Sequence, residues 1–120
     1  MTPKSGMDLI NEAKTRIREL SPRDVQEKRQ RGDDAVYLDV REPNEWNLGR
    51  IPGAVHIPRG TLETKIEQAI PREQEIVIYC AGGNRSALAA DTLRQMGYEN
   101  VASLSGGWRE WVQSGGDVEG

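Results

Sequence analysis

The only cysteine of the chain, Cys80, stands between an apolar run and a helix-forming run. Gly82 and Gly83 follow it closely, and Arg85 lies five positions on. Glycine lets the backbone adopt positive φ and approach a bound group. A short loop that enters a helix N-terminus turns successive N–H groups inward and can hold an anion. Those dipoles and the arginine would favour the thiolate form of Cys80, so the spacing predicts a reactive sulfur nucleophile.

Each of these residues also has a plainer interpretation. A free cysteine is usually a small buried apolar residue, and its position at a strand end does not by itself distinguish the two roles. Arg85 could be a solvated arginine, although a cation is disfavoured in the first turn of a helix. An arginine kept there suggests an anion for it to bind. The glycines, the arginine and the helix start together favour the reactive thiolate.

The single histidine, His56, raises the alternative of a Cys–His hydrolase, in which it would have to lie beside Cys80. It sits in the strand-like segment AVHIP, however, and a lone histidine is usually a packed or edge residue. We therefore expect no catalytic role for His56.

The elements that must position the cysteine follow from the hydrophobic pattern. Short apolar runs predict strands at residues 35–40, 76–80 and 100–104. Helices are predicted at residues 7–20, 21–32, 61–70, 85–97 and, as a short closing helix, 107–116. Buried strands that alternate with helices indicate an α/β domain with a mainly parallel central sheet and helices on both faces. Cys80 then lies at the carboxyl end of a strand, where ligands gather in open α/β sheets.

Length and composition narrow the class of protein. The chain has 120 residues, enough for one compact domain, and a formal net charge of −3 that predicts neither nucleic acid nor an anionic membrane as partner. One cysteine excludes an intrachain disulfide and a Cys-rich zinc site, and we expect no metal or cofactor. We see no signal-peptide core and no apolar run of membrane-spanning length, so we expect a soluble, cytoplasmic protein.

The two ends of the chain are expected to differ from its middle. Residues 1–19 are predicted to form a helical extension, because apolar residues recur at helical steps along 7–20. The main domain is expected to cover residues 20–115. The glycine-rich residues 116–120 are expected to be a flexible tail that frays.

Three separated segments resemble the single-domain rhodaneses, which are sulfurtransferases. YLDVREPNEWNLGRIPGAVHIP is similar to the family's first signature, YCAGGNRS to its active-site loop, and LSGGWREW to its closing signature. They occur in the family's order and cover roughly residues 20 to 115. Arg50 departs from the pattern, because the family often has histidine there, and no histidine can assist at that position. The resemblance implies a rhodanese-like domain that carries sulfane sulfur as a cysteine persulfide.

The length of the cysteine loop separates sulfur transfer from phosphate chemistry. The resemblance extends to arsenate reductases and dual-specificity phosphatases, whose loops have five residues between cysteine and arginine. Here four residues intervene between Cys80 and Arg85, and position 86 is serine, so the longer spacing is not available. A shorter loop makes a smaller ring of N–H donors, which should fit one outer sulfur atom better than a whole phosphate.

The mechanism that the resemblance implies is a double displacement. Cys80 takes the outer sulfur of thiosulfate or another persulfide donor and passes it to cyanide or to a thiol, for example a thiol protein such as thioredoxin. The N–H groups of the loop are expected to bind the transferred sulfur, and they belong to Ala81, Gly82, Gly83, Asn84, Arg85 and Ser86. Alternatives are a non-enzymatic binding or sulfide-sensing module and, less favoured, a phosphatase or arsenate reductase.

Two charged residues at the end of the first predicted strand are expected to support this loop. The Asp39 carboxylate could accept N–H groups of the loop, and the resemblance favours that role over an ordinary surface carboxylate. Arg41 could add positive charge at the mouth or pair with Glu45, and the sequence leaves both open. Gly106 and Gly107 suit a tight turn between strand and helix.

Overall fold

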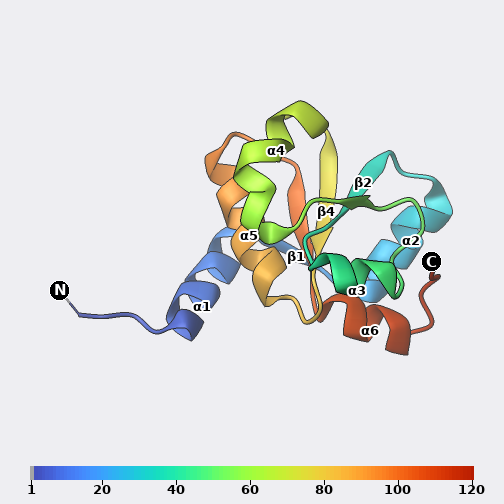
Figure 1. Ribbon diagram of the computed structural model, residues 1–120, viewed down its shortest axis with the longest axis horizontal. Helices are drawn as coiled ribbons and strands as arrows, with labels where there is room; N and C mark the ends of the chain where they lie inside the picture. Colours follow the sequence, from blue (N-terminus) through green and yellow to red (C-terminus); the bar gives the residue numbers. More distant parts are fainter. Residues whose placement is uncertain (1) are drawn as a thin grey trace.

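A five-stranded parallel sheet lies between two layers of helices in the computed structural model, which describes residues 2–120 (Figure 1). The strand order is β1-β5-β4-β2-β3, and every neighbouring pair is parallel. The strands are β1 (Arg18–Leu20), β2 (Ala35–Asp39), β3 (Val55–His56), β4 (Glu75–Tyr79) and β5 (Val101–Leu104). The predicted α/β class is confirmed, and β4, which leads into Cys80, is the central strand.

The helices begin and end at the signals that the sequence carries. They are α1 (Gly6–Arg16), α2 (Pro22–Arg31), α3 (Pro43–Asn47), α4 (Leu62–Ala69), α5 (Asn84–Gln95) and α6 (Gly107–Gln113), with a 3₁₀ turn η1 (Arg59–Thr61) before α4. At the start of α2, the Ser21 hydroxyl accepts the N–H of Asp24, whose carboxylate accepts the N–H of Ser21. Gly32 ends that helix at φ 75°, in the left-handed region.

Alternation along β4 sends its side chains to two separate cores. Ile76 and Ile78 pack with residues of α4 and α5, whereas Val77 and Tyr79 pack with residues of α2 and α6. Cys80 continues the first set and belongs to the α4 and α5 core. The helices on both faces therefore hold β4, and with it the start of the cysteine loop, from two sides.

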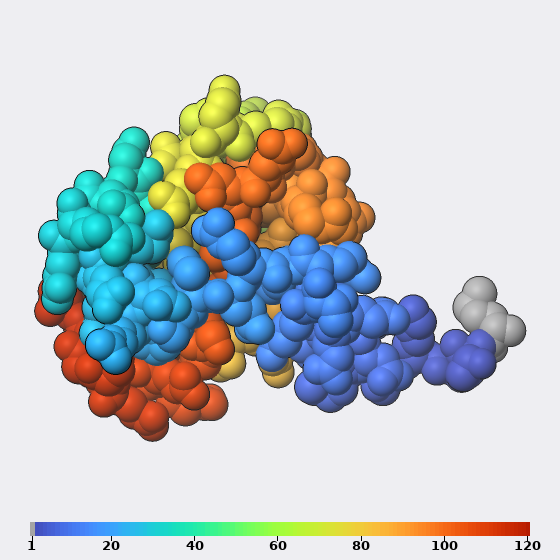
Figure 2. Space-filling view, turned by 180° about the vertical axis from the view of Figure 1, so that it is seen from behind, coloured from blue at the N-terminus to red at the C-terminus, as the bar shows by residue number. Residues whose placement is uncertain are grey.

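The N-terminal helix is present, but it ends at Arg16 and not at residue 20. Residues 18–20 instead form β1, which pairs with β5. Ile17 packs against the α4 and α5 core, and Leu20 packs against the core on the other face. A spacing of three puts two residues on one side of a helix but on opposite faces of a strand, so the apolar pattern alone favoured the wrong element. Figure 2 shows residues 2–5 extending away from the body of the protein.

The C-terminal residues, which we expected to fray, are bonded to the domain. Arg50 and Glu119 exchange two backbone hydrogen bonds of 3.0 and 2.9 Å, and the indole N–H of Trp111 donates to the carbonyl of Asp117 at 2.8 Å. A Cβ on Gly116 would overlap the Trp111 ring. Glycine here permits close packing, whereas composition alone associated it with flexibility.

Between residues 2 and 120, no helix has both the length and the apolar character needed to cross a membrane.

Candidate active site

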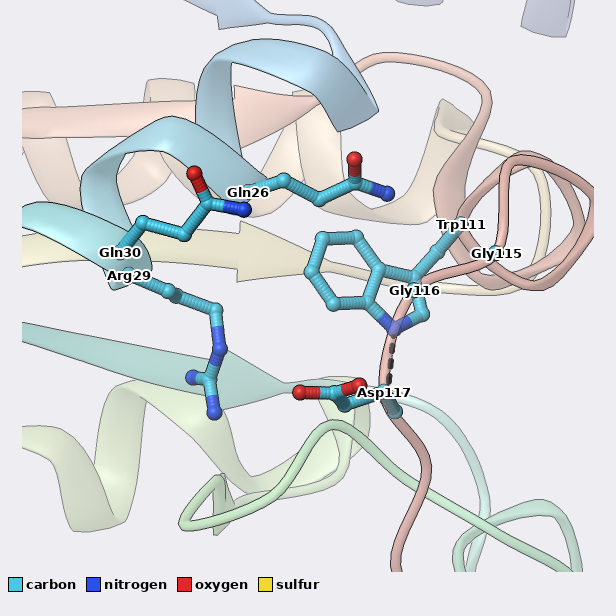
Figure 3. Close-up of a pocket in the computed structure, with 7 residues that line it drawn as sticks. All are labelled: Gln26, Arg29, Gln30, Trp111, Gly115, Gly116 and Asp117. Atoms are coloured by element: carbon cyan, nitrogen blue, oxygen red, sulfur yellow. Dashed lines mark hydrogen bonds between the residues drawn. The ribbon is translucent and has the colours of Figure 1, made fainter.

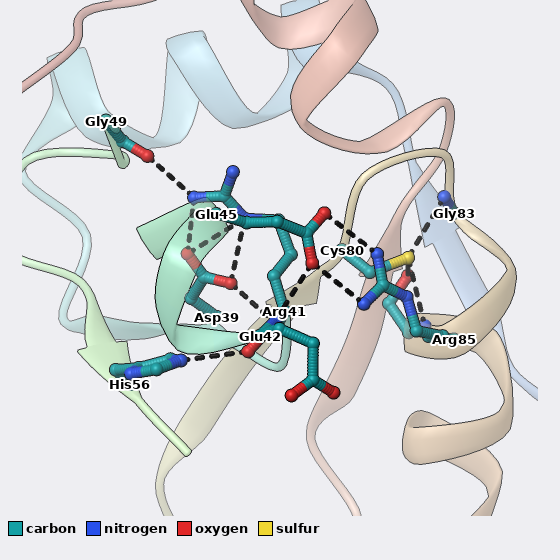
Figure 4. A network of polar contacts seen from close by, with 10 residues as sticks. Asp39, Arg41, Glu42, Glu45, Gly49, His56, Cys80, Gly83 and Arg85 are labelled. Atoms are coloured by element: carbon teal, nitrogen blue, oxygen red, sulfur yellow. Dashed lines mark hydrogen bonds and ion pairs between the residues drawn. The ribbon is translucent and has the colours of Figure 1, made fainter. Parts of the chain in front are cut away.

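The cysteine loop turns the chain from β4 into α5 and surrounds the sulfur with polar groups. The Sγ of Cys80 accepts the N–H of Gly83 at 3.1 Å and the N–H of Ser86 at 3.3 Å, and it lies 3.4 Å from the Ser86 hydroxyl (Figure 4). Gly83 has φ 101°, a conformation that glycine allows, and its N–H points at the sulfur. Of the six loop residues, Gly83 and Ser86 direct their N–H groups at Sγ itself. That the loop N–H groups bind a transferred outer sulfur stays a prediction.

The thiol is also deeply buried. Cys80 is 1% exposed and packs within the α4 and α5 core, as expected for an ordinary buried cysteine. Its hydrogen bonds to two backbone N–H groups are not expected for a purely apolar residue. The residues around it are more open: Gly82 and Asn84 are exposed, and Arg85 is half-buried. The sulfur therefore lies at the base of the loop, and we call the side of the loop on which Gly82, Asn84 and Arg85 reach the surface its mouth.

The turn before α6 holds the loop from behind. The N–H of Trp108 donates to the Cys80 carbonyl at 2.7 Å, and the N–H of Arg109 donates to the Ala81 carbonyl at 3.1 Å. Gly107 has φ 60°, and a Cβ on it would lie 2.5 Å from the Cys80 carbonyl oxygen. The predicted tight turn is confirmed, and its close approach to the loop explains why glycine is needed.

One polar neighbour of the cysteine loop was missed from the sequence. Ser103, buried in β5, lies with its hydroxyl 2.8 Å from the hydroxyl of Ser86, which in turn contacts Sγ. The signal that could have revealed it is a serine inside the apolar run VASL, because a buried hydroxyl needs a partner. A hydroxyl can rotate, so Ser86 can accept from the thiol or donate to a thiolate.

Asp39 and Arg41 pair with each other behind the loop. The Asp39 carboxylate accepts the backbone N–H of Arg41 at 2.9 Å and its guanidinium at 2.7 to 3.1 Å, and Arg41 also donates to the Gly49 carbonyl at 2.7 Å. The guanidinium lies 4.7 Å from the ring centre of Trp108. The expectation that Asp39 accepts loop amides was wrong, and so were both expectations for Arg41. Two charges buried together must satisfy one another.

Arg85 is already engaged by a carboxylate. Its Nη1 and Nη2 donate to the two oxygens of Glu45 at 3.1 and 3.2 Å, and Glu45 reaches the mouth from α3. The hydrogen bonds from Arg85 are the main cause that holds the pKa of Glu45 below its ordinary value. An anion that used Arg85 as predicted would therefore have to compete with Glu45.

His56 lies away from the thiol. Its Nε2 is 2.9 Å from the carbonyl oxygen of Arg41, and its ring stacks on Trp46 at 4.7 Å between ring centres. No contact joins it to Cys80 within residues 2–120. This placement agrees with the prediction that His56 is a packed residue and gives no support to a Cys–His hydrolase.

Two further cations flank the loop, and neither was singled out from the sequence. Lys14 of α1 donates to the Asn84 side chain at 3.3 Å. The guanidinium of Arg109 lies beside Gly82, since a Cβ there would be 3.6 Å from its Nη1. These positions depend on how α1 and α6 pack, which motif spacing does not reveal.

A polar hollow lies elsewhere on the molecule, between α2 and the C-terminal turn (Figure 3). In this view the guanidinium of Arg29 faces the carboxylate of Asp117. It is lined by Gln26, Arg29, Gln30, Trp111, Gly115, Gly116 and Asp117. None of these residues belongs to the cysteine loop, so this hollow is separate from the surroundings of Cys80.

Comparison with known proteins places this geometry in a family. A candidate mitochondrial thiosulfate sulfurtransferase of Schizosaccharomyces pombe is 34% identical over 97 residues, which are 70% of this chain and 68% of that protein. A sulfurtransferase of Allochromatium vinosum is 36% identical over 83 residues, which are 69% of this chain and 77% of that protein. A candidate sulfur carrier protein of Bacillus subtilis is 33% identical over 109 residues, and the match spans 91% of this chain but only 58% of that protein.

A solved structure agrees along nearly the whole chain. A Rhodopseudomonas palustris protein of unknown function, described as a possible tyrosine phosphatase, superposes with a TM-score of 0.90 at 36% identity, over 99% of this chain and 97% of that one. Residues 21–114 match the family model of the rhodanese-like domain. The protein thus belongs to the rhodanese-like domain family.

Proposed function

We propose that this protein is a sulfurtransferase that carries sulfane sulfur as a persulfide on Cys80. The observation that carries the proposal is the pair of backbone N–H groups, from Gly83 and Ser86, that point at Sγ at the carboxyl end of the central strand. The names of the relatives support a sulfurtransferase activity of this general kind.

The reaction has two steps in which a sulfur nucleophile attacks sulfur. The Cys80 thiolate attacks the outer sulfur of thiosulfate, the sulfur–sulfur bond of thiosulfate breaks, and sulfite leaves with the bonding electron pair. Cyanide then attacks the outer sulfur of the persulfide, thiocyanate leaves, and the thiolate is restored. A persulfide can replace thiosulfate as donor, and a thiol, including one on a protein such as thioredoxin, can replace cyanide as acceptor. Covalent catalysis of this kind splits one transfer into two easier ones.

The first turn of α5 supplies the groups that would hold the second sulfur. The N–H groups of Asn84 and Arg85 lie in that turn, where no intrahelical acceptor is available to them. The positive end of the helix favours the negative charge of a bound persulfide. These groups are in place before reaction, so the loop does not need to reorganise as charge develops on the outer sulfur.

The recessed position of the thiol favours sulfur over phosphate. Cys80 is 1% exposed, so the donor must bring its reacting atom down to the base of a short loop. The outer sulfur of thiosulfate or of a persulfide is terminal and can do so. The phosphorus of a phosphate ester is enclosed by oxygens, which the four-residue spacing to Arg85 leaves little room to seat. The description of the Rhodopseudomonas neighbour makes phosphate turnover a useful control.

Intact mass spectrometry tests the proposal directly. After incubation with thiosulfate, the wild-type protein should gain the mass of one sulfur atom, and cyanide should remove it with release of thiocyanate. The Cys80→Ser variant should gain nothing. The proposal fails if the wild type takes up sulfur neither from thiosulfate nor from a persulfide, or if Cys80→Ser keeps full activity. Hydrolysis of an aryl phosphate without sulfur uptake would identify a phosphatase instead.

A further inference from the structure

The positive charge of the arginine in the cysteine loop is balanced by a carboxylate of the same chain. Arg85 and Glu45 form a two-pronged ion pair, with side chains that remain 36% and 29% exposed. In Figure 4 the guanidinium of Arg85 is drawn next to the Sγ of Cys80, and the carboxylate of Glu45 lies on the other side of that guanidinium. Two-pronged pairs between arginine and a carboxylate are among the stronger hydrogen-bonded contacts in proteins. A donor that approaches the sulfur therefore meets a carboxylate as well as a guanidinium.

Glu45 is fixed in this position by more than Arg85. One of its oxygens also accepts the backbone N–H of Glu42 at 2.9 Å, which ties the side chain to the start of α3. The next residue, Trp46, stacks on His56 of β3 and anchors the same helix to the edge of the sheet. The fold thus holds the Glu45 carboxylate in place. Moving it aside would break its hydrogen bonds to the Arg85 side chain and to the backbone of Glu42.

A fixed negative charge at the mouth affects donors unequally. Thiosulfate carries two negative charges, and its sulfonate end would have to lie near Arg85, where Glu45 already binds. The sulfur–sulfur end of an organic persulfide carries at most one negative charge. It has no sulfonate group, so it does not need Arg85 to bind one. Repulsion between charges of like sign scales with the product of the charges, so Glu45 disfavours the dianion more strongly.

We propose that Glu45 is a specificity-determining residue that selects organic persulfides over thiosulfate as the sulfur donor. It acts by occupying Arg85 and by placing a carboxylate beside the mouth. This inference rests on the proposed sulfur transfer at Cys80 and goes beyond it by naming the donor class that the site favours.

The Glu45→Gln variant isolates the charge. Glutamine keeps the size of the side chain and an oxygen that can accept the N–H of Glu42. The rate constant for sulfur uptake from thiosulfate, followed by intact mass, should rise about three- to fivefold, since a part-exposed charge pair of this kind is modest in strength. Uptake from cysteine persulfide should change less than about twofold by the same reasoning.

Glu42→Gln is the matched control. It removes one negative charge from the start of the same helix, and Glu42 is exposed and forms no ion pair within the part of the chain that the structure describes. Its uptake from both donors should stay within about twofold of the wild type, because an exposed charge is screened by solvent. A rise in thiosulfate uptake equal to that of Glu45→Gln would overturn the proposal, because the effect would then be one of net charge.

A binding measurement separates this inference from the proposed function. In the Cys80→Ser background, where no sulfur can be transferred, Glu45→Gln should lower the dissociation constant of thiosulfate in calorimetry about three- to fivefold. An unchanged dissociation constant would overturn the role of Glu45 whether or not the protein transfers sulfur. An equal loss of uptake from both donors in Glu45→Gln would also overturn this role, because Glu45 would then only support the structure of the loop.

Discussion

Two pairs of arginine and carboxylate lie close to the same cysteine loop, and they differ mainly in their access to water. The side chains of Asp39 and Arg41 are 0% and 3% exposed, whereas those of Glu45 and Arg85 are 29% and 36% exposed. Arg41 also donates to the Gly49 carbonyl and lies over the Trp108 ring, so the buried pair has little capacity left for a ligand.

The difference shows that a charged residue near an active site gains its role from its surroundings. A buried pair acts as a rigid part of the fold, because removing either charge leaves the other stranded in a medium of low polarity. A half-exposed pair is held weakly enough for solvent or a ligand to compete with it. The pair of Asp39 and Arg41 is therefore a fixed structural part of the end of β2, whereas the pair of Glu45 and Arg85 is the one that we propose affects the choice of donor.

The largest effect should come from Asp39→Asn, which leaves the Arg41 guanidinium buried without its counter-charge. The free energy of unfolding should fall by about 3 to 5 kcal/mol. Denaturant titration measures this loss, and Asp34→Asn, at an exposed position shortly before β2, serves as the control. A loss below about 1 kcal/mol would mean that the buried pair of Asp39 and Arg41 contributes no more to stability than an exposed ion pair does.

The backing of the loop is tested by Gly107→Ala. The new Cβ would lie 2.5 Å from the Cys80 carbonyl oxygen at a residue with φ 60°. We expect a loss of about 2 to 3 kcal/mol in unfolding free energy, together with slower sulfur uptake as the loop shifts. Gly60→Ala is the control, because nothing lies within 4 Å of a Cβ at that site. Equal stability of the two variants would show that the turn before α6 does not hold the loop.

A smaller effect is expected from Ser103→Ala, which removes a buried but uncharged partner of the loop. Ser86 loses the 2.8 Å hydrogen bond between the two hydroxyls, at a cost of about 1 kcal/mol in unfolding free energy. Thermal or denaturant unfolding measures it, with Ser105→Ala as the neighbouring control. If Ser103→Ala lowered the unfolding free energy as much as Asp39→Asn, the large effect expected at Asp39 would not be due to its buried charge.

The smallest effect on stability should be that of Glu45→Gln, below about 1 kcal/mol at neutral pH. Because Arg85 lowers the pKa of Glu45 from its ordinary value of 4.5, the ionised carboxylate stabilises the folded state fully above that value. The contribution is then lost as the pH falls through the lowered pKa. Unfolding measured at a series of pH values should show the difference between wild type and variant shrinking on acidification below 4.5. A difference that grows on acidification would contradict this assignment.

Local patterns predicted the elements that make up the sheet and the loop. The apolar runs at 35–40, 76–80 and 100–104 coincide within a residue with β2, β4 and β5, because a strand buried on both faces must be apolar throughout. Prediction was wrong at 18–20, where the same apolar spacing suits a helix or a strand. It was also wrong for the last residues, where the glycine content said nothing of the Trp111 ring that packs on Gly116.

By itself, the sequence determined that a lone cysteine ends a buried strand and that glycines and a helix start follow it, because those features depend on residues adjacent in the chain. Only the tertiary structure decided which charges meet. Arg41 binds Asp39, and Arg85 binds Glu45 across forty positions. Ion pairing depends on distance and on exposure to water, and both are set by how α3 and α5 pack around the end of the sheet.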